Sequence, residues 1–404
     1  MADMKCSHTG RSAGRQSTGS KTNPPAVVDA LHSKSRVTPS AKQAARRKGR
    51  GHRQKTDDDR EIENVVFGNV RFRAWYQSWY PKDFIGEGKG VIKNLYVCPK
   101  CFAYSRGEDD TEIHAWLRHW KSCRRVVIPG SRIYVHGKWE EEGIDGVEEE
   151  RGTWSIWEVD GAIETLFCQN LSLFAKIFLD NKSVFFDVSA FNFFLLVYAP
   201  PSADPPQSPQ IVGFFSKEKM SWDNNNLACI LIFPPWQHRG LGSLLIGISY
   251  AIARREEIMG GPEKPISELG MKSYQSYWAS EIAKFLLQWR EDTQPGLDVN
   301  TISRGTWISP DDCLSVLREM EIYEHGGSLT LASHSLQMAD EQPEALESQG
   351  KLRRRGTDKK KDCVQIDKQR VRKWVACKGI RMERLVCEQG FRPGYALKIR
   401  QTSE

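Results

Sequence analysis

The chain has 404 residues, of which 39% are hydrophobic and 27% are charged, and its formal net charge is +7. This length exceeds one average domain and supplies enough apolar material for two or three folded units. The longest apolar run, SAFNFFLLVYAP, is too short and too polar to cross a bilayer, and no apolar segment follows the first methionine, so we expect a soluble, non-secreted protein with no membrane role. Its ten cysteines should then stay reduced, as thiols, core residues or metal ligands.

The N-terminal arm is rich in Ser, Thr, Gly and Pro and contains the stretch KQAARRKGRGHRQK, which has no acidic residue. This composition predicts a disordered basic arm rather than a packed core. The arm could act as a nuclear localisation signal or contact DNA, or it could be a solvated tail. The sequence leaves both interpretations open.

A metal-binding pattern follows an aromatic segment. Cys98 and Cys101 form a C-x-x-C pair, and His119 and Cys123 have the i, i+4 spacing that places two side chains on one face of a helix. Zinc prefers four tetrahedral sulfur and nitrogen ligands, and four protein ligands leave no open position for catalysis. We therefore predict a structural zinc ion on these four residues. The loop before His119 is longer than in usual fingers, and His114 is a competing ligand that the helical geometry disfavours.

The stretch LACILIFPPWQHRGLGSLLIG, at 227–247, predicts a buried strand, a turn and a helix. Pro234 and Pro235 end the apolar strand, and apolar residues then recur at helical spacing. On the turn, Gly240 and Gly242 belong to a Q-x-x-G-x-G pattern, where glycines allow tight curvature and the helix start offers free N–H groups to an anion such as pyrophosphate. Spaced glycines alone are a weak signal, but neither G-x-G-x-x-G nor a P-loop lysine is present.

These stretches resemble the MYST family of histone acetyltransferases. The glycine turn is similar to the family's coenzyme A motif, and further similar segments follow the family's order: IWEVDG, LFCQNLSLFAKIFLDNKSVFFDV, IVGFFSKEK, NNNLACILIFP and GGPEKPISELGMKSYQSYW. The zinc pattern and the preceding AWYQSWYP agree with the same family. The resemblance covers roughly residues 63–290, continues weakly to about 325, and is greatest for the fungal SAS-type silencing catalytic subunits.

The resemblance implies an α/β (α+β) chain with the N-acetyltransferase fold: a central mixed sheet, an N-terminal Cys-Cys-His-Cys zinc finger and a winged-helix-like C-terminal region. The organisation expected from it has five parts. They are a disordered basic arm at 1–62, an aromatic segment and zinc finger at 63–130, an acetyl-CoA-binding catalytic core at 131–290, a helical C-terminal region at 291–335, and a basic insertion and tail at 336–404.

The resemblance also implies catalytic residues. A lysine ε-amine has a reference pKa of about 10.4, so a base must remove its proton before it can attack a thioester. Glu263, in GGPEKP, matches the family's general base, and Lys182 matches its autoacetylated lysine. Cys229 lies where its thiol would approach the thioester. It could accept the acetyl group, it could stand beside a direct attack by lysine in a ternary complex, or it could be a plain core cysteine.

The coenzyme contacts implied by the family pattern run along the strand, the turn and the following helices. They are Ile230, Leu231 and Ile232 on the acyl-pantetheine arm, then His238, Arg239, Gly240, Leu241, Gly242 and Ser243 around the pyrophosphate, with Ser267 and Ser276 as further contacts. The turn departs from the usual P-Q-Y-Q-R pattern, and Ser243 stands where lysine is common. We therefore expect one phosphate contact to be missing and coenzyme affinity to be reduced.

The sequence thus predicts a nuclear histone lysine acetyltransferase that uses acetyl-CoA, carries structural zinc and acts in chromatin silencing or transcription regulation. Its expected partners are histone tails, nucleosomes and the scaffold subunits of a small acetyltransferase complex, and the basic arm could contact DNA. Two alternatives are a non-catalytic zinc-finger chromatin-binding or scaffold subunit, and an acetyltransferase weakened by its altered turn that serves chiefly as a scaffold.

Overall fold

The computed structural model describes residues 60–86, 91–137, 152–201, 208–290, 297–322 and 367–397, together with the backbone of a short strand at 28–29. The predictions made for the basic arm and for the insertion near 338–362 fall outside the described residues. None of the helices within the described ranges is long and apolar enough to cross a bilayer.

The N-terminal part of the described chain forms a five-stranded sheet in the order β1-β3-β2-β4-β5. Its strands are β1 (Val28–Asp29), β2 (Ile62–Phe67), β3 (Val70–Arg73), β4 (Ile92–Val97) and β5 (Tyr104–Ser105). A turn at Gly68, whose φ of 64° lies in the left-handed region, joins β2 to β3 as an antiparallel hairpin. The helices α1 (Lys82–Ile85) and α2 (Asp110–Ser122) belong to the same part, and Asp109 caps α2 by accepting from the N–H of Glu112.

The central sheet has the order β10-β9-β8-β7-β6, and its neighbouring strands are antiparallel. The strands are β6 (Ser131–His136), β7 (Thr153–Asp160), β8 (Phe191–Ala199), β9 (Gln210–Glu218) and β10 (Cys229–Ile232). One parallel bridge, between Leu227 and Pro262, adds a parallel element at the β10 side. The predicted α/β (α+β) fold class is confirmed, because the described chain combines two five-stranded sheets with helices.

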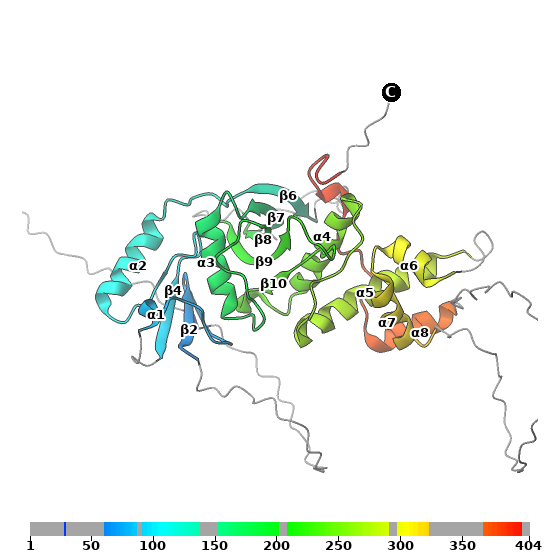
Figure 1. The fold of residues 1–404 in the computed structure, drawn as a ribbon, viewed down its shortest axis with the longest axis horizontal. Helices are drawn as coiled ribbons and strands as arrows, with labels where there is room; N and C mark the ends of the chain where they lie inside the picture. The colour runs from blue at the N-terminus through cyan, green and yellow to red at the C-terminus, as the bar shows by residue number, and fades with distance from the viewer. Residues whose placement is uncertain are drawn as a thin grey trace, which may run out of the picture.

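The central sheet is buried on both faces because a helix covers each one. Successive side chains of a strand point to opposite faces. On β8, Phe193 belongs to the core cluster that contains residues of α3 (Thr165–Lys176), whereas Phe194 belongs to the cluster that contains residues of α4 (Leu241–Arg255). Figure 1 shows α3 on one side of these strands and α4 on the other. This explains why the middle of β8 reads as a continuous apolar run.

Aromatic packing joins the N-terminal sheet to the central one. The ring of Phe174, on α3, lies 5.3 Å from Phe67 of β2, 5.4 Å from Phe102, and 4.9 Å from Phe233, which directly follows β10. All four side chains are buried, and each contributes roughly 1.5–3 kcal/mol of hydrophobic stabilisation. The N-terminal part is therefore packed into the same core as the segment around β10.

The C-terminal part of the described chain is helical. Its elements are η3 (Pro234–Trp236) before α4, then α5 (Glu268–Gln288), α6 (Val299–Thr306), α7 (Pro310–Glu319), α8 (Lys368–Lys378) and η4 (Glu388–Gly390). Helices α5 to α8 share one apolar core. Beyond α8 the chain returns to the central sheet, where Phe391 bridges Tyr134 of β6. The described residues of the predicted tail, 367–397, are thus packed onto the fold, because Val371 of α8 and Phe391, which follows η4, each belong to one of its apolar cores.

Candidate functional site

The four predicted metal ligands converge at one end of the N-terminal sheet. Cys98 follows β4, Cys101 lies in the turn before β5, and His119 and Cys123 lie at the end of α2. Their ligand atoms all lie within 4.8 Å of one another, and the Sγ atom of Cys101 is 3.2 Å from Nε2 of His119. Tetrahedral zinc with bonds of about 2.3 Å holds its ligand atoms roughly 3.8 Å apart. The donor set and its spacing therefore fit a zinc ion.

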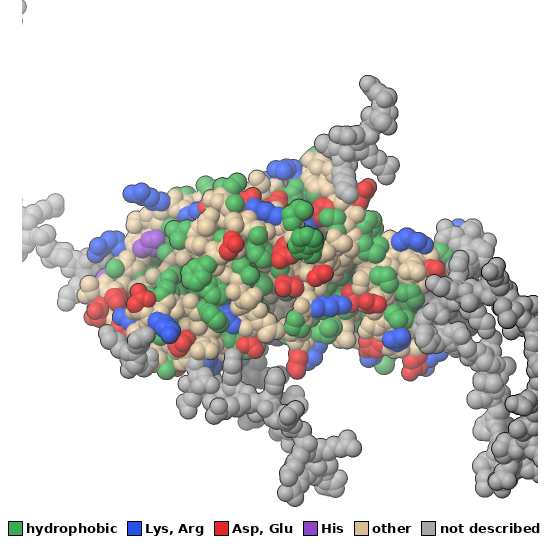
Figure 2. Space-filling model, viewed as in Figure 1, with side chains coloured by type: hydrophobic (Ala, Val, Ile, Leu, Met, Phe, Trp, Pro, Cys, Tyr) green, Lys and Arg blue, Asp and Glu red, His purple; other side chains and the backbone are tan. Residues whose placement is uncertain are grey.

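Backbone hydrogen bonds hold the chain around this cluster. The N–H of Cys98 donates to the carbonyl of Ala103, and the N–H of Phe102 donates back to the carbonyl of Cys98, which folds the C-x-x-C stretch into a tight turn. The hydrogen bond from Cys101 lowers the pKa of the Cys98 thiol to about 5, so one thiolate is favoured. Nδ1 of His114 bonds instead to the carbonyl of Asp110, away from the cluster. Figure 2 shows histidine side chains gathered at the end of the molecule that α2 forms.

A second group of side chains meets where β10 begins. Cys229, the first residue of β10, is half-buried, and its N–H donates to Oγ of Ser216 on β9. Lys182, in the loop after α3, is only 5% exposed, and its Nζ lies 3.9 Å from Sγ of Cys229. Among the described residues, this thiol is the one hydrogen-bonding neighbour of the Lys182 ammonium. A buried cation with so weak a partner is costly.

Glu263 is held beside this group by its backbone. Its N–H donates to the carbonyl of Leu227 at 2.8 Å, two residues before β10. Glu263 is an exposed residue, but partial desolvation of its carboxyl raises the pKa, the negative charge of Glu218 raises that pKa further, and the Lys182 ammonium lowers it. The structure thus brings Lys182, Cys229 and Glu263 into one electrostatic neighbourhood. A raised pKa moves a carboxylate base closer to working pH.

The strand that carries Cys229 has a free outer edge. The segment that contains Pro262 runs parallel to the chain at Leu227, and the N–H of Asn226 donates to the carbonyl of Gly261. Within the described chain, no strand is paired with β10 beyond this point on the side away from β9. An edge strand presents unpaired N–H and C=O groups that can bind an extended ligand. The predicted contacts Ile230, Leu231 and Ile232 lie on this edge strand.

The predicted glycine turn lies at the start of α4. Gly240 is the N-cap of this helix with a φ of 79°, and His238 has a φ of 63°, so both adopt left-handed backbone. A Cβ atom added at Gly242 would meet no atom within 4 Å. Nε2 of Gln237 donates to the carbonyl of Ile232 at 2.7 Å and fastens the turn to β10. The first-turn N–H groups and the positive end of the helix dipole together suit an anion.

The two predicted serine contacts differ in their surroundings. Ser267 is the N-cap of α5, where its Oγ accepts from the N–H of Gly270, so it has a structural role in the fold. Ser276 is exposed on α5. Ser243 lies in the first turn of α4 and carries no charge.

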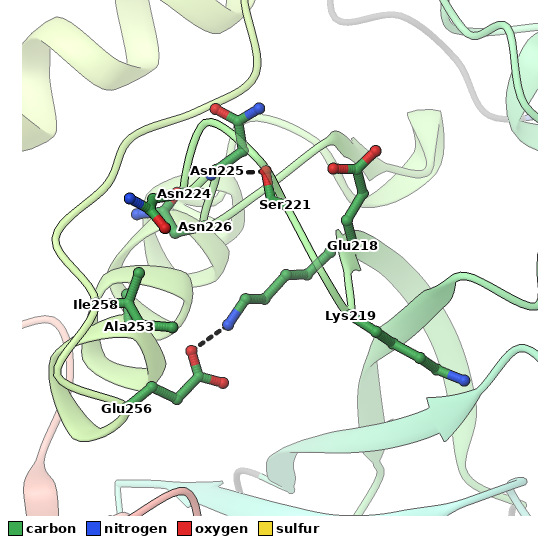
Figure 3. Close-up of a pocket in the computed structure, with 10 residues that line it drawn as sticks. Glu218, Lys219, Ser221, Asn224, Asn225, Asn226, Ala253, Glu256 and Ile258 are labelled. Atoms are coloured by element: carbon green, nitrogen blue, oxygen red, sulfur yellow. Dashed lines mark hydrogen bonds and ion pairs between the residues drawn. The ribbon is translucent and has the colours of Figure 1, made fainter.

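A polar pocket that the sequence did not reveal lies between the end of β9 and the end of α4. Figure 3 shows its lining, in which the carboxylate of Glu256 is joined to the Lys217 ammonium and the side chain of Glu218 points away from this pair. Asn226 also lines it, and its side chain is buried. The sequence did not indicate Glu218 and Ser216 as site residues, because no local motif marks them. Only the pairing of β9 with β10 places them beside the Cys229 and Glu263 group.

Two segments of the chain match known protein families. Residues 59–123 match the family model for the MYST family zinc finger domain, and residues 129–367 match the model for the MOZ/SAS family.

Three relatives illustrate the likeness. The histone acetyltransferase mst2 of Schizosaccharomyces pombe is 36% identical over 264 residues, which cover 65% of this chain and 56% of that protein. The histone acetyltransferase MOF of Drosophila melanogaster is also 36% identical over 264 residues, covering 65% of this chain and 28% of that protein. The histone acetyltransferase SAS3 of Saccharomyces cerevisiae is 32% identical over 281 residues, covering 66% and 31%. The chain therefore spans between 28% and 56% of the length of these relatives.

Proposed function

This chain belongs to the MOZ/SAS family, and from that premise we propose that it is a histone lysine acetyltransferase that transfers acetyl from acetyl-CoA to a lysine ε-amine. The observation that carries the proposal is the convergence of Lys182, Cys229 and Glu263 at the start of an edge strand whose other end leads to the glycine turn. A thioester donor and an amine acceptor could meet there.

The donor would lie along β10 and the turn after it. In this proposal the amide groups of the pantetheine arm bond to the free edge of Cys229–Ile232 as an added strand does. The pyrophosphate would then lie at the N-terminus of α4, where the open space at Gly242 lets the backbone approach it. This arrangement places the thioester near Cys229, at the opposite end of the strand from the phosphates.

Glu263 is assigned the role of general base. The substrate ε-ammonium gives a proton to the Glu263 carboxylate, and the neutral amine then attacks the thioester carbonyl carbon. The C–S bond breaks, and the departing sulfur takes the second amine proton, so that the coenzyme leaves as a thiol and the lysine nitrogen becomes a neutral amide. The raised pKa of Glu263 supports this role, since a base works best when its pKa lies near the operating pH. We favour this direct attack over an acetyl-Cys229 intermediate because a thioester is already an activated donor.

Lys182 is proposed to be acetylated by the same site. Its ammonium is buried, and the Cys229 thiol is a weak neighbour for a charge. Acetylation would replace this buried cation with a neutral amide, which lowers the cost of burial. Mass spectrometry of the purified protein should find acetyl on Lys182, and Glu263→Gln should remove it. Acetylation that persists in an inactive Glu263→Gln protein would show that another source modifies this lysine.

The biological setting is proposed from the family and from the names of the relatives. Histone tails and nucleosomes would be the substrates, the nucleus the location, and a small acetyltransferase complex with scaffold subunits the working form, in chromatin silencing or transcription regulation. The five-part organisation expected from the sequence is kept in this proposal, with the described residues 367–397 assigned to the folded part.

The deciding experiment incubates the purified chain with labelled acetyl-CoA and core histones. We expect label on histone lysines with the unaltered chain and a strong loss with Glu263→Gln, which keeps the size of the side chain. Thermal unfolding of both proteins serves as the folding control. Transfer that is absent from a folded, zinc-loaded chain would reject the enzyme and favour a non-catalytic chromatin-binding or scaffold subunit. A slow rate that does not respond to Glu263→Gln would favour the weakened acetyltransferase.

A further inference from the structure

The segment after α8 crosses α5 and reaches α4, as the red part of the ribbon in Figure 1 shows. Oγ of Ser280, a buried residue of α5, donates to the carbonyl of Arg381 at 2.6 Å, and Nζ of Lys284 donates to the carbonyl of Glu383 at 2.8 Å. Farther along, Cγ2 of Val386 lies so close to Gly247 of α4 that a Cβ atom there would be 2.9 Å away. The backbone is therefore held at Arg381 itself and at two positions after it.

This course carries the Arg381 side chain to the glycine turn. Its Nη1 atom lies 3.5 Å from the position that a Cβ atom on Gly240 would occupy. Gly240 is the N-cap of α4, so the guanidinium stands over the helix terminus from which the first-turn N–H groups project. The side chain is exposed, and its guanidinium forms no hydrogen bond or ion pair with any residue in the described part of the chain.

The Arg381 guanidinium and the N-terminus of α4 thus lie close together, and the guanidinium has no ion pair among the described residues. The N-terminus of a helix carries about half a positive charge, and the guanidinium carries a full one, so they repel each other unless an anion lies between them. Arg239, on the turn itself, adds another exposed cation. The planar guanidinium matches two phosphate oxygens at once and stays charged at all working pH values.

We propose that Arg381 binds a phosphate group of the coenzyme and supplies the cation that the turn lacks at Ser243. The proposal rests on the function proposed above and names a further residue of the same site. Arg381 lies beyond the residues that match the family model, which end at 367. Its backbone is anchored on α5, where the Arg381 carbonyl accepts from Oγ of Ser280. The reduced coenzyme affinity expected from Ser243 is thereby offset.

Calorimetry on the full chain tests this role with coenzyme A as the probe. We expect Arg381→Ala to raise the Kd for coenzyme A about ten- to a hundredfold, since a hydrogen bond to a charged group is lost. Arg381→Lys should recover part of the affinity. Arg372→Ala removes an exposed arginine from α8 and should leave the Kd unchanged. Dephospho-coenzyme A, which lacks the 3′-phosphate, tells the phosphates apart. If the ratio of its Kd to the Kd of coenzyme A is the same in Arg381→Ala as in the unaltered chain, Arg381 binds the pyrophosphate. If that ratio falls to near one in Arg381→Ala, Arg381 binds the 3′-phosphate.

A second arm uses S-acetyl-pantetheine, which has the thioester but no phosphate, as the donor in the transfer assay. Arg381→Ala should raise the KM for acetyl-CoA and leave kcat/KM for S-acetyl-pantetheine as it was. Equal or tighter coenzyme binding by Arg381→Ala would overturn the proposal, and so would an equal loss with both donors or with Arg372→Ala. If the unaltered chain binds no coenzyme A, the proposed function fails and this inference fails with it.

Discussion

The metal cluster and the proposed transfer centre, which consists of Lys182, Cys229 and Glu263, are assembled in opposite ways. In the metal cluster, Cys101 and His119 are only 18 positions apart, and all four ligands belong to one short segment. In the transfer centre, Lys182 and Cys229 are 47 positions apart and come from different elements, with Glu263 on a third segment. The four ligand atoms of the metal cluster face one another, whereas Cys229 of the second site lies on an edge strand of the described sheet.

This difference indicates that the metal cluster stabilises the fold, whereas the side chains of the proposed transfer centre serve the reaction. An ion held by four side chains ties a turn to a helix, so its binding free energy is also folding free energy. The transfer centre takes its geometry from the packing of the central sheet against α3 and α4. Changes to its side chains should therefore alter the reaction and leave the fold in place. The predictions below test this contrast, from the largest effect to the smallest.

Loss of a metal ligand should have the largest effect. We expect Cys123→Ser to release about one equivalent of zinc and to destabilise the N-terminal sheet severely, because structural zinc binding in finger peptides is worth about 10–16 kcal/mol. Metal analysis and thermal unfolding measure the two effects. His114→Ala is the matched control and should keep the ion, since His114 lies outside the cluster. Full zinc content in Cys123→Ser, or loss of zinc in His114→Ala, would contradict the assigned ligands.

Loss of the base should abolish most of the reaction and spare the fold. Glu263→Gln is expected to lower turnover by about 10² to 10⁴-fold near neutral pH, the usual contribution of a general base. In the unaltered chain the rate should rise as pH passes upward through the raised Glu263 pKa, because the carboxylate form is the active one. In Glu263→Gln this rise should vanish, and the residual rate should recover only at higher pH, where substrate amine is already neutral. A pH–rate profile with the same acidic limb in both proteins would refute the role.

A change at the glycine turn should weaken coenzyme binding by a smaller factor. Gly240→Asp places a negative charge at the N-terminus of α4, at a residue whose φ is 79°, and we expect its Kd for coenzyme A to rise at least about tenfold. Gly240→Asn has nearly the same size and tolerates left-handed backbone, so the difference between the two variants isolates the charge. Calorimetry supplies both constants. Identical affinities in the two variants would move the phosphates away from this helix terminus.

Loss of the thiol should have the smallest effect. Because the proposed mechanism needs no acetyl-cysteine, Cys229→Ala should keep its rate within about tenfold of the unaltered chain once Lys182 is acetylated. Initial rates should give intersecting double-reciprocal lines, as a ternary complex requires. Parallel lines, a trapped acetyl group on Cys229 and a folded but inactive Cys229→Ala protein would make the cysteine the nucleophile.

The sequence alone determined the features that depend on short-range spacing. The C-x-x-C pair and the helical spacing of His119 and Cys123 indicated the metal ligands, because a turn and a helix fix side-chain positions locally. The strand, turn and helix around Gly240 followed from apolar periodicity and two prolines, and the structure has β10, η3 and α4 there. Family resemblance then named Glu263 and Lys182, which local sequence alone would have left as surface residues.

Only the tertiary structure decided which distant segments meet. It placed β10 at the edge of the described sheet, and it set Ser216 and Glu218 of β9 beside Cys229 and Glu263. It also returned the segment after α8 across α5, which brings Arg381 to Gly240. Strand order and the course of a returning segment depend on which apolar faces pack together over the whole chain. Local periodicity records that a face is apolar, and it does not record the partner that the face will meet.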